Sequence, residues 1–364
     1  MTISRSFSPR LSLVGLVLAA SAAVSGCGER PPVDSVQHGY RGTGMVQVYN
    51  PRLVAAQTQN NVVPEPVPAV PSDGPRARDV YKNVPVLGDL SVAEFNRLMV
   101  AISNWVSPNE QCTYCHRAGE GFESDSVYQK VVARRMIQMT QAINTRWGAH
   151  VGNTGVTCYT CHRGNHNPVE VFYKAPPSPQ STTLLGDNAG QNRASPSVTL
   201  ASLPYDALSD YLSGANEIRV NGTTALPTGN RQSIKQAEFT YGLMVHMSDS
   251  LGVNCTYCHN TQNFGSWAGA PPQRVSAWHG IRMAREVNNL YIDPLKPVFP
   301  ASEYGPTGDL AKVSCATCHQ GAYKPLYGVS MLKDYPELGR VTGGLQAAAA
   351  QPGATAVQGL TPPR

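Results

Sequence analysis

The sequence has no cysteine outside five short sites. Its nine cysteines are Cys27 and four pairs, and in each pair two residues separate the cysteines and a histidine follows directly. The pairs are Cys112 and Cys115, Cys158 and Cys161, Cys255 and Cys258, and Cys315 and Cys318. A histidine after every pair argues against a framework of disulfides. It also argues against structural zinc, whose ligand sets rarely repeat in this form.

Two further features are missing. After the N-terminal leader, no hydrophobic run reaches the roughly 20 residues that a membrane-spanning helix needs. No basic cluster with interleaved aromatic residues occurs either, so nucleic acid is not an expected partner. Strand signals are weak, and with 29 prolines and 33 glycines much of the chain is expected to be loop. We therefore expect a mainly α fold with extensive loop.

Residues 1–26 form a predicted signal peptide of the lipoprotein type. Two arginines precede an apolar stretch over 11–24. The leader ends in Val24-Ser25-Gly26-Cys27, which resembles the bacterial lipoprotein box. That resemblance implies cleavage before Cys27, lipidation of its sulfur and anchoring of the mature chain by the acyl chains. The alternatives are an uncleaved signal anchor and a Cys27 that is an unmodified thiol.

Each Cys-x-x-Cys-His motif is typical of covalent haem attachment. Two thioethers hold the porphyrin, and the histidine supplies one axial nitrogen to the iron. The histidines are His116, His162, His259 and His319. The sequence therefore predicts four covalently bound c-type haems.

An internal repeat divides the chain into two halves with two motifs each. Leu98-Met99-Val100 precedes the first motif as Leu243-Met244-Val245 precedes the third, and both motifs are Cys-Thr-Tyr-Cys-His. We expect a multihaem cytochrome c built of two pseudo-symmetric haem-pair halves. The predicted divisions are a signal peptide over 1–26, a lipidated N-terminus and extended segment over 27–80, the first half over 81–173, a connector over 174–230, the second half over 231–335 and a disordered tail over 336–364.

Four helices are predicted, one ahead of each motif. A capping-box pattern opens the first at Ser91, and Ser126-Val-Tyr-Gln129 opens the second. The predicted helices cover about 91–107, 126–147, 233–250 and 272–290. Residues 50–78, by contrast, are rich in proline without a helical period, and we expect them to be extended.

The sixth ligand of each iron separates an electron carrier from an enzyme. Iron with methionine or histidine in this place is saturated, whereas an open place lets small molecules bind and react. Met99 and Met244 occupy the same position in the repeat, and Met136 precedes the second motif on its predicted helix. A methionine at helical spacing is more often ordinary core, but recurrence ahead of three motifs favours ligation. Met139 and Met247 are the nearest rivals.

The fourth haem leaves two candidates open. The repeat aligns Met283 with Met136, whereas His150 lies just ahead of the second motif and has no counterpart in the other half. Nothing in the repeat distinguishes the weaker candidates, which are His166, His246 and His279.

With these motifs and spacings, the chain resembles the tetrahaem cytochrome subunit of the photosynthetic reaction centre of purple bacteria over about residues 35–335. The resemblance implies methionine as the sixth ligand of the first three haems and histidine as that of the fourth. The implied ligands are Met99, Met136 and Met244 for the first three haems in order, and His150 opposite His319 for the fourth. Met283 would then be a packing residue.

The resemblance also implies the function. The haems would stand in the order first, second, fourth, third, with the third nearest the photo-oxidised chlorophyll pair. Electrons would come from a soluble periplasmic donor, either a small cytochrome c or a high-potential iron–sulfur protein. The implied partners are this donor and the membrane-embedded reaction centre subunits. The lipid anchor would hold the chain at the periplasmic face of the inner photosynthetic membrane.

Two other classes stay open from the residues alone. A periplasmic multihaem reductase would need an open iron with acid–base groups nearby, which four sixth-ligand candidates disfavour. A lipid-anchored carrier for another membrane oxidoreductase would have the same ligands. In either carrier a haem with two histidines should have the lowest potential. Arg274 and Arg282 are candidate partners of the haem propionates.

Overall fold

The computed structural model describes residues 33–38, 45–176, 195–201, 203–220 and 234–341. The predicted signal peptide, the lipidation site Cys27 and the chain from 342 onward lie outside these ranges. Helices and irregular segments make up most of the described chain, as the sequence predicts. None of the helices in these ranges is long and apolar enough to cross a membrane.

Four long helices dominate, close to their predicted positions. They are α4 (Val92–Val106), α5 (Tyr128–Arg146), α9 (Ile234–Leu251) and α10 (Gln273–Glu286), the last continued by a π-helical turn, η5 (Val287–Ile292). The capping box of α4 is present, since the Glu94 amide donates to Ser91 Oγ and Glu94 Oε2 accepts from the Ser91 amide. The second helix begins two residues later than predicted, at Tyr128 and without a side-chain cap, and the Ser126 hydroxyl donates to Glu120 instead.

The shorter helices surround these four. They are α2 (Pro51–Asn60), α3 (Ala77–Val80), α6 (Gly148–Val151), α7 (Cys158–His162), α8 (Ser209–Leu212) and α11 (Cys315–His319). Helix α2 lies inside the segment that the sequence predicts as extended. Asn50 caps it by accepting from the Arg52 amide, and Pro51 occupies its first turn, where a missing amide hydrogen costs nothing.

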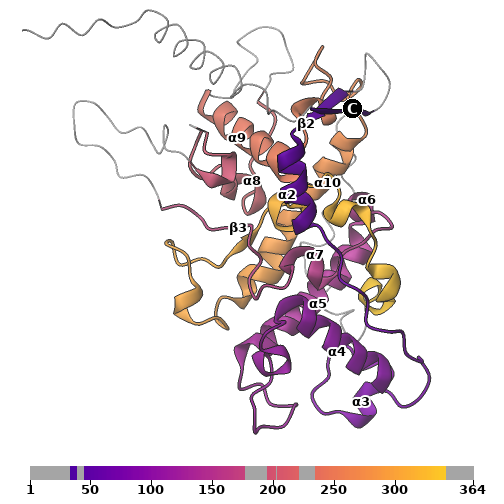
Figure 1. The fold of residues 1–364 in the computed structure, drawn as a ribbon. Coiled ribbons are helices and arrows are strands. Elements are labelled where there is room, and N and C mark those ends of the chain that lie inside the picture. The colour runs from indigo at the N-terminus through magenta and orange to yellow at the C-terminus, as the bar shows by residue number, and fades with distance from the viewer. Residues whose placement is uncertain (1–32, 39–44, 177–194, 202, 221–233, 342–364) are drawn as a thin grey trace, which may run out of the picture.

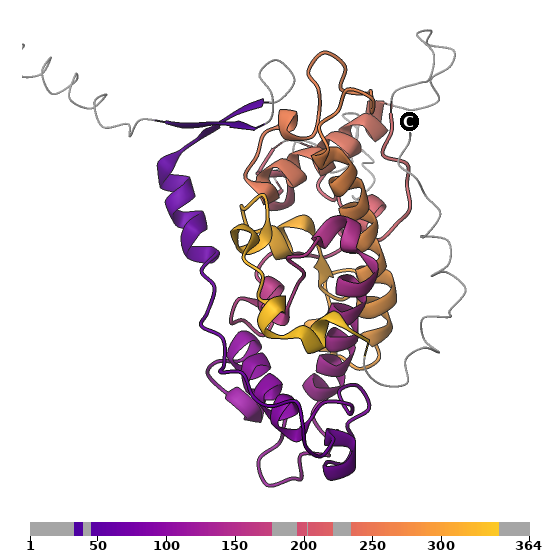
Figure 2. The ribbon, with the colours of Figure 1, turned by 90° about the vertical axis from the view of Figure 1, so that its right-hand side faces the viewer.

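Two small antiparallel sheets complete the fold. Strand β1 (Asp34–His38) pairs with β2 (Met45–Tyr49), and β3 (Val171–Phe172) pairs with β4 (Lys312–Val313) in the register Val171 to Val313. The second sheet joins the end of the predicted first half to the predicted second half. Figures 1 and 2 show an elongated molecule in which α4 lies toward one end and α9 toward the other.

Three apolar clusters hold the helices together. The first packs α4 against the C-terminal segment, the second packs α8 against α9 and α10, and the third lies between α5 and η5. The C-terminal segment corrects a prediction, because Pro336–Gly339 forms the 3-10 turn η10 and Leu338 is fully buried. Burial of Leu338 orders residues that composition alone assigns to a disordered tail. Likewise Leu212, in the predicted connector, is core.

Candidate haem sites

The second and fourth motifs, here called the inner motifs, form helical turns of the same construction. They are α7 and α11, and each begins with a capping box in which two hydroxyl side chains and two backbone amides bond reciprocally. The reciprocal pairs are Thr157 with Thr160 and Ser314 with Thr317. Each turn ends at a left-handed residue, Arg163 or Gln320.

A glycine then attaches each inner motif to a long helix. Gly164 and Gly321 have φ values of 83° and 81°, a conformation that residues with a Cβ rarely adopt. The Gly164 amide donates to the Trp105 carbonyl of α4, and the Gly321 amide donates to the Ser250 carbonyl of α9, both at 2.8 Å. The two inner motifs are thus fixed to their helices in the same way.

The first and third motifs, here called the outer motifs, have a tighter backbone. They begin with 3-10 turns, η1 (Gln111–Tyr114) and η4 (Cys255–Tyr257). Neither has the pair of hydroxyl residues that caps the inner turns. The first cysteines of the outer motifs, Cys112 and Cys255, are exposed, whereas Cys158 of an inner motif is buried. The outer motifs therefore lie at the surface and the inner motifs inside.

Backbone carbonyls orient three of the four motif histidines. In each of them the ring Nδ1 donates to a backbone carbonyl. The pairs are His162 with Asn165 at 3.0 Å, His259 with Phe264 at 3.0 Å and His319 with Ala322 at 2.9 Å. This bond leaves Nε2 free to coordinate a metal. Within the described chain, His116 Nδ1 is buried without a hydrogen bond. Burial lowers the pKa of all four rings, that of His319 to about 4, which favours the neutral form that binds metal.

A cavity of about 730 Å³ lies between the inner motifs and the long helices. Its lining includes residues from all four motifs, among them Cys115, Cys158, Cys161, Tyr257, Cys315 and Cys318. This volume is within the roughly 300–1,000 Å³ of sites that hold organic ligands. The cysteine and histidine donors of the motifs fit covalently attached haem.

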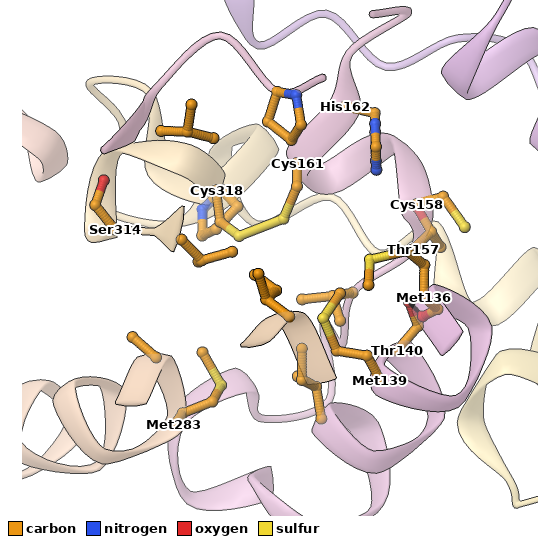
Figure 3. Close-up of a pocket in the computed structure, with 18 of the residues that line it drawn as sticks. Met136, Met139, Thr140, Thr157, Cys158, Cys161, His162, Met283, Ser314 and Cys318 are labelled. Carbon is orange, nitrogen blue, oxygen red and sulfur yellow. Dashed lines mark hydrogen bonds between the residues drawn. A yellow bond between two sulfur atoms is a disulfide. The ribbon is translucent and has the colours of Figure 1, made fainter. Parts of the chain in front are cut away.

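The inner motifs meet at their second cysteines. The Cα atoms of Cys161 and Cys318 are 4.5 Å apart, and their sulfurs form a disulfide (Figure 3). The sequence predicts a thioether at each of these sulfurs, and a sulfur cannot form both bonds. Haem attachment at both inner motifs therefore excludes this disulfide.

Four methionines of the described chain line the cavity, of which Met247 comes from α9. Met136 and Met139 come from α5, and Met283 comes from α10 (Figure 3). Thr140 Oγ1 donates to the Met136 carbonyl, a bond within α5 that involves the backbone of Met136 and not its thioether. Proximity to the cavity is thus shared by the predicted ligand Met136, by its rival Met139 and by Met283, the alternative to His150 at the fourth haem.

His150 faces the fourth motif. Its Nδ1 donates to the Ser276 carbonyl of α10 at 2.9 Å, and its ring centroid lies 6.1 Å from that of His319. With metal–nitrogen bonds of about 2 Å, a metal between two imidazoles separates their ring centroids by about 6 Å. The spacing of His150 and His319 therefore fits an iron between them.

Met99 and Met244 lie outside the cavity lining. Both are partly buried, Met99 against the first apolar cluster and Met244 against the second. Helix α4, which carries Met99, contacts the η1 turn of the first motif. Met247, the rival of Met244, lines the cavity instead. The assignments of Met99 and Met244 as ligands stay predictions.

The weaker histidine candidates have other partners. The His166 ring stacks on Tyr114 with centroids 3.9 Å apart, and its Nε2 lies 2.9 Å from Glu110 Oε2. Buried His246 donates from Nδ1 to the Ser197 carbonyl at 2.7 Å. His279 packs edge-on against its neighbour Trp278. These contacts explain the three side chains without ligation.

The two arginines predicted to pair with propionates stack on tryptophans. The Arg274 guanidinium lies 4.2 Å from the centroid of Trp267, and that of Arg282 lies 3.3 Å from the centroid of Trp278. Burial lowers the pKa of Arg282 to about 10. Pairing of either guanidinium with a propionate stays a prediction.

Two polar residues that carry no clear sequence signal join the inner motifs to α2. Arg163 Nη2 donates to the Cys318 carbonyl at 3.0 Å, which links the two motifs directly. Asn61, which caps the end of α2, donates to the Gln320 carbonyl at 3.2 Å and accepts from the Leu326 amide at 3.1 Å. Helix α2 and the two inner motifs therefore form one hydrogen-bonded unit.

Comparison with known proteins agrees with this chemistry. The family model of the photosynthetic reaction centre cytochrome C subunit matches residues 29–339. The chain belongs to this family. It is 55% identical over 350 residues to the photosynthetic reaction center cytochrome c subunit of Rubrivivax gelatinosus, covering 96% of this chain and 93% of that protein.

Two further relatives carry the same description. The protein of Thermochromatium tepidum is 51% identical over 329 residues, which are 90% of this chain and 80% of the relative. That of Roseobacter denitrificans is 39% identical over 341 residues, 90% of this chain and 91% of the relative. The chain is therefore an electron-transfer protein with covalently bound c-type haem, and not an enzyme.

Proposed function

We propose that the chain is a tetrahaem carrier that re-reduces the photo-oxidised special pair of the reaction centre with electrons from a soluble periplasmic donor. The observation that carries the proposal is the single cavity whose lining includes residues of all four Cys-x-x-Cys-His motifs. Haems attached at motifs around one interior can exchange electrons inside the protein, away from water. Bound haem supplies one-electron transfer, and the chain holds, orients and shields it.

The proposed ligand set is the one that the family resemblance implies. The motif histidines are the fifth ligands, and Met99, Met136, Met244 and His150 are the sixth ligands in haem order. The spacing of His150 and His319 supports the fourth assignment most directly. The carbonyl bonds at Nδ1 of three motif histidines support the fifth ligands.

Contacts between the motifs favour the haem order first, second, fourth, third. The second and fourth motifs lie side by side, with Cys161 and Cys318 in contact. The first motif adjoins α4, to which Gly164 ties the second motif, and the fourth motif adjoins α9, which leads into the third. The same glycine attachment in both halves supports the two pseudo-symmetric haem pairs.

The chain start supports a membrane-proximal third motif. The Asn254 amide, directly before that motif, donates to Gln47 Oε1 of β2 at 2.9 Å. Strand β1 pairs with β2 and begins at Asp34, seven residues beyond Cys27. An extended chain spans at most about 3.6 Å per residue, so a lipid on Cys27 would lie within about 25 Å of this hairpin. We propose that this anchor holds the chain at the periplasmic face.

Co-purification tests the proposal. Extraction in mild detergent should recover the chain with bacteriochlorophyll-bearing subunits, and a light flash should then oxidise its haem. Recovery without those subunits, or a flash that leaves the haem reduced, would count against the assignment. Carbon monoxide added to the reduced protein at native pH should cause no clear spectral shift. A clear shift would favour an open iron and the reductase alternative.

A further inference from the structure

Gly280 lies in the interior of α10, where glycine needs an explanation. In a helix interior, glycine is about 1 kcal/mol less favourable than alanine. The φ of Gly280 does not lie in the left-handed region, so its backbone conformation suits any residue. The reason for glycine must therefore lie in the space where a side chain would stand.

That space is filled by the His150 ring. A Cβ at position 280 would lie 2.5 Å from Cε1, 2.9 Å from Nδ1 and 3.1 Å from Nε2 of His150. Contacts below 3.0 Å require one partner to move. The ring cannot turn away freely, because α6, which carries it, packs against α10 and its Nδ1 is bonded to the Ser276 carbonyl at 2.9 Å.

The position of Ser276 explains the close approach. In an α-helix, the carbonyl of residue 276 faces the amide of residue 280, one turn further on. A ring that bonds this carbonyl from outside the helix must pass over position 280. Only glycine leaves room there, and the ring so placed lies 6.1 Å from the His319 ring between centroids.

Met283 lies three residues beyond Gly280 on α10 and lines the same cavity. Residues three apart share a helix face, so α10 presents an empty position and a thioether side by side. We propose that Gly280 is a positioning residue that admits His150, rather than Met283, as the sixth ligand of the fourth haem. This inference rests on the proposed function, because it requires an iron at His319.

Replacing Gly280 by alanine tests the proposal in the full, haem-loaded protein. The Gly280→Ala variant should lose the spectroscopic signature of bis-histidine iron, and the number of methionine-ligated haems should rise by one. The double variant Gly280→Ala with Met283→Leu should lose the same signature and gain one haem that binds carbon monoxide. Gly148→Ala is the matched control, because a Cβ there meets nothing within 4 Å, and it should keep the bis-histidine signature.

A bis-histidine signature that persists in Gly280→Ala would overturn the proposal. If the unsubstituted protein lacks that signature, the assignment of His150 as ligand fails instead, so the two failures are distinguishable. Stability provides a second readout. Gly280→Ala should lower the unfolding midpoint in the unsubstituted protein but not in a His150→Ala background, where the ring is gone. Should Gly280→Ala alone fail to accumulate, the His150→Ala double variant should accumulate, and failure of both would contradict the proposal.

Discussion

The inner and outer haem motifs share one sequence pattern but occupy different surroundings. The inner motifs, 158–162 and 315–319, are capped helical turns that contact each other and the α2 segment. The outer motifs, 112–116 and 255–259, are 3-10 turns whose first cysteines are exposed. The same covalent chemistry can therefore serve two tasks. We propose that the buried motifs hold haem in the interior and that the exposed motifs present haem to partner proteins.

Replacing the cysteine pair of one motif should have the largest effect on stability, and this effect should differ between inner and outer motifs. The Cys158→Ser/Cys161→Ser variant should lose its haem and destabilise the protein, because the buried space beside α7 is left unfilled. Large cavities in cores cost about 3–5 kcal/mol, which in a protein of this size lowers the midpoint by on the order of 10 °C. Cys112→Ser/Cys115→Ser should lose one haem with a smaller shift. Haem content per chain measures the loss of haem, and thermal unfolding measures the change in the midpoint. Equal changes in the midpoint of the two variants would contradict the distinction between inner and outer motifs.

Exchanging the proposed sixth ligand of the fourth haem tests which side chain binds the iron at this inner motif. His150→Met should raise the potential of the fourth haem by on the order of 100 mV, since axial ligands set haem potentials over about 0.8 V. Met283→Leu should leave the four potentials nearly unchanged, because that side chain is proposed to pack rather than ligate. Redox titration of each variant measures the potentials. A shift caused by Met283→Leu alone would reverse the assignment.

Asn61 tests whether α2 stabilises the inner motifs specifically. Asn61→Ala leaves the Gln320 carbonyl and the Leu326 amide without this partner. A buried polar group without a partner costs about 1–3 kcal/mol. Denaturant unfolding should show this loss, and amide exchange should accelerate at 315–326 more than at the outer motifs. The control is Gln59→Ala, at an exposed position of the same helix.

Asp125 supplies the smallest predicted effect, at an outer motif. Its carboxylate accepts from Arg134 Nη2 at 2.7 Å, and this bond holds the pKa of Asp125 well below its usual range. The ion pair therefore stabilises the fold above the ordinary carboxyl pKa and loses this effect as the pH falls through the folded value. Asp125→Asn should cost about 0.2–1 kcal/mol at pH 7, as for other partly exposed pairs. Unfolding curves of variant and parent should converge in acid.

Local patterns predicted the parts of the fold that local forces decide. The helix from Ser91 was predictable because its capping box and apolar spacing agree, and both are present. Helix α2 was missed because the proline-rich run after Asn61 dominates the composition of 50–78, although Asn50-Pro51 is a usable start signal. The order of 336–339 depends on burial of Leu338 against α5 and α4, a tertiary contact that no local pattern contains.

In the candidate site, too, local sequence patterns predict some features and long-range packing decides others. The cysteines and motif histidines follow from a short pattern, and the hydroxyl residues at the start of the inner turns, Thr157 and Ser314, can be read from the sequence. The contact of His150 with the α10 helix joins residues 126 apart in sequence, at Ser276. Such contacts depend on the packing of whole helices, so the choice between His150 and Met283 required the family resemblance.

The most direct test of the account is near-infrared magnetic circular dichroism of the fully oxidised, haem-loaded protein. This measurement separates iron with one histidine and one methionine from iron with two histidines by their charge-transfer bands. The account predicts three haems of the first kind and one of the second, with the bis-histidine signal lost on His150→Met. Four histidine–methionine haems, or any haem without a sixth protein ligand, would contradict it.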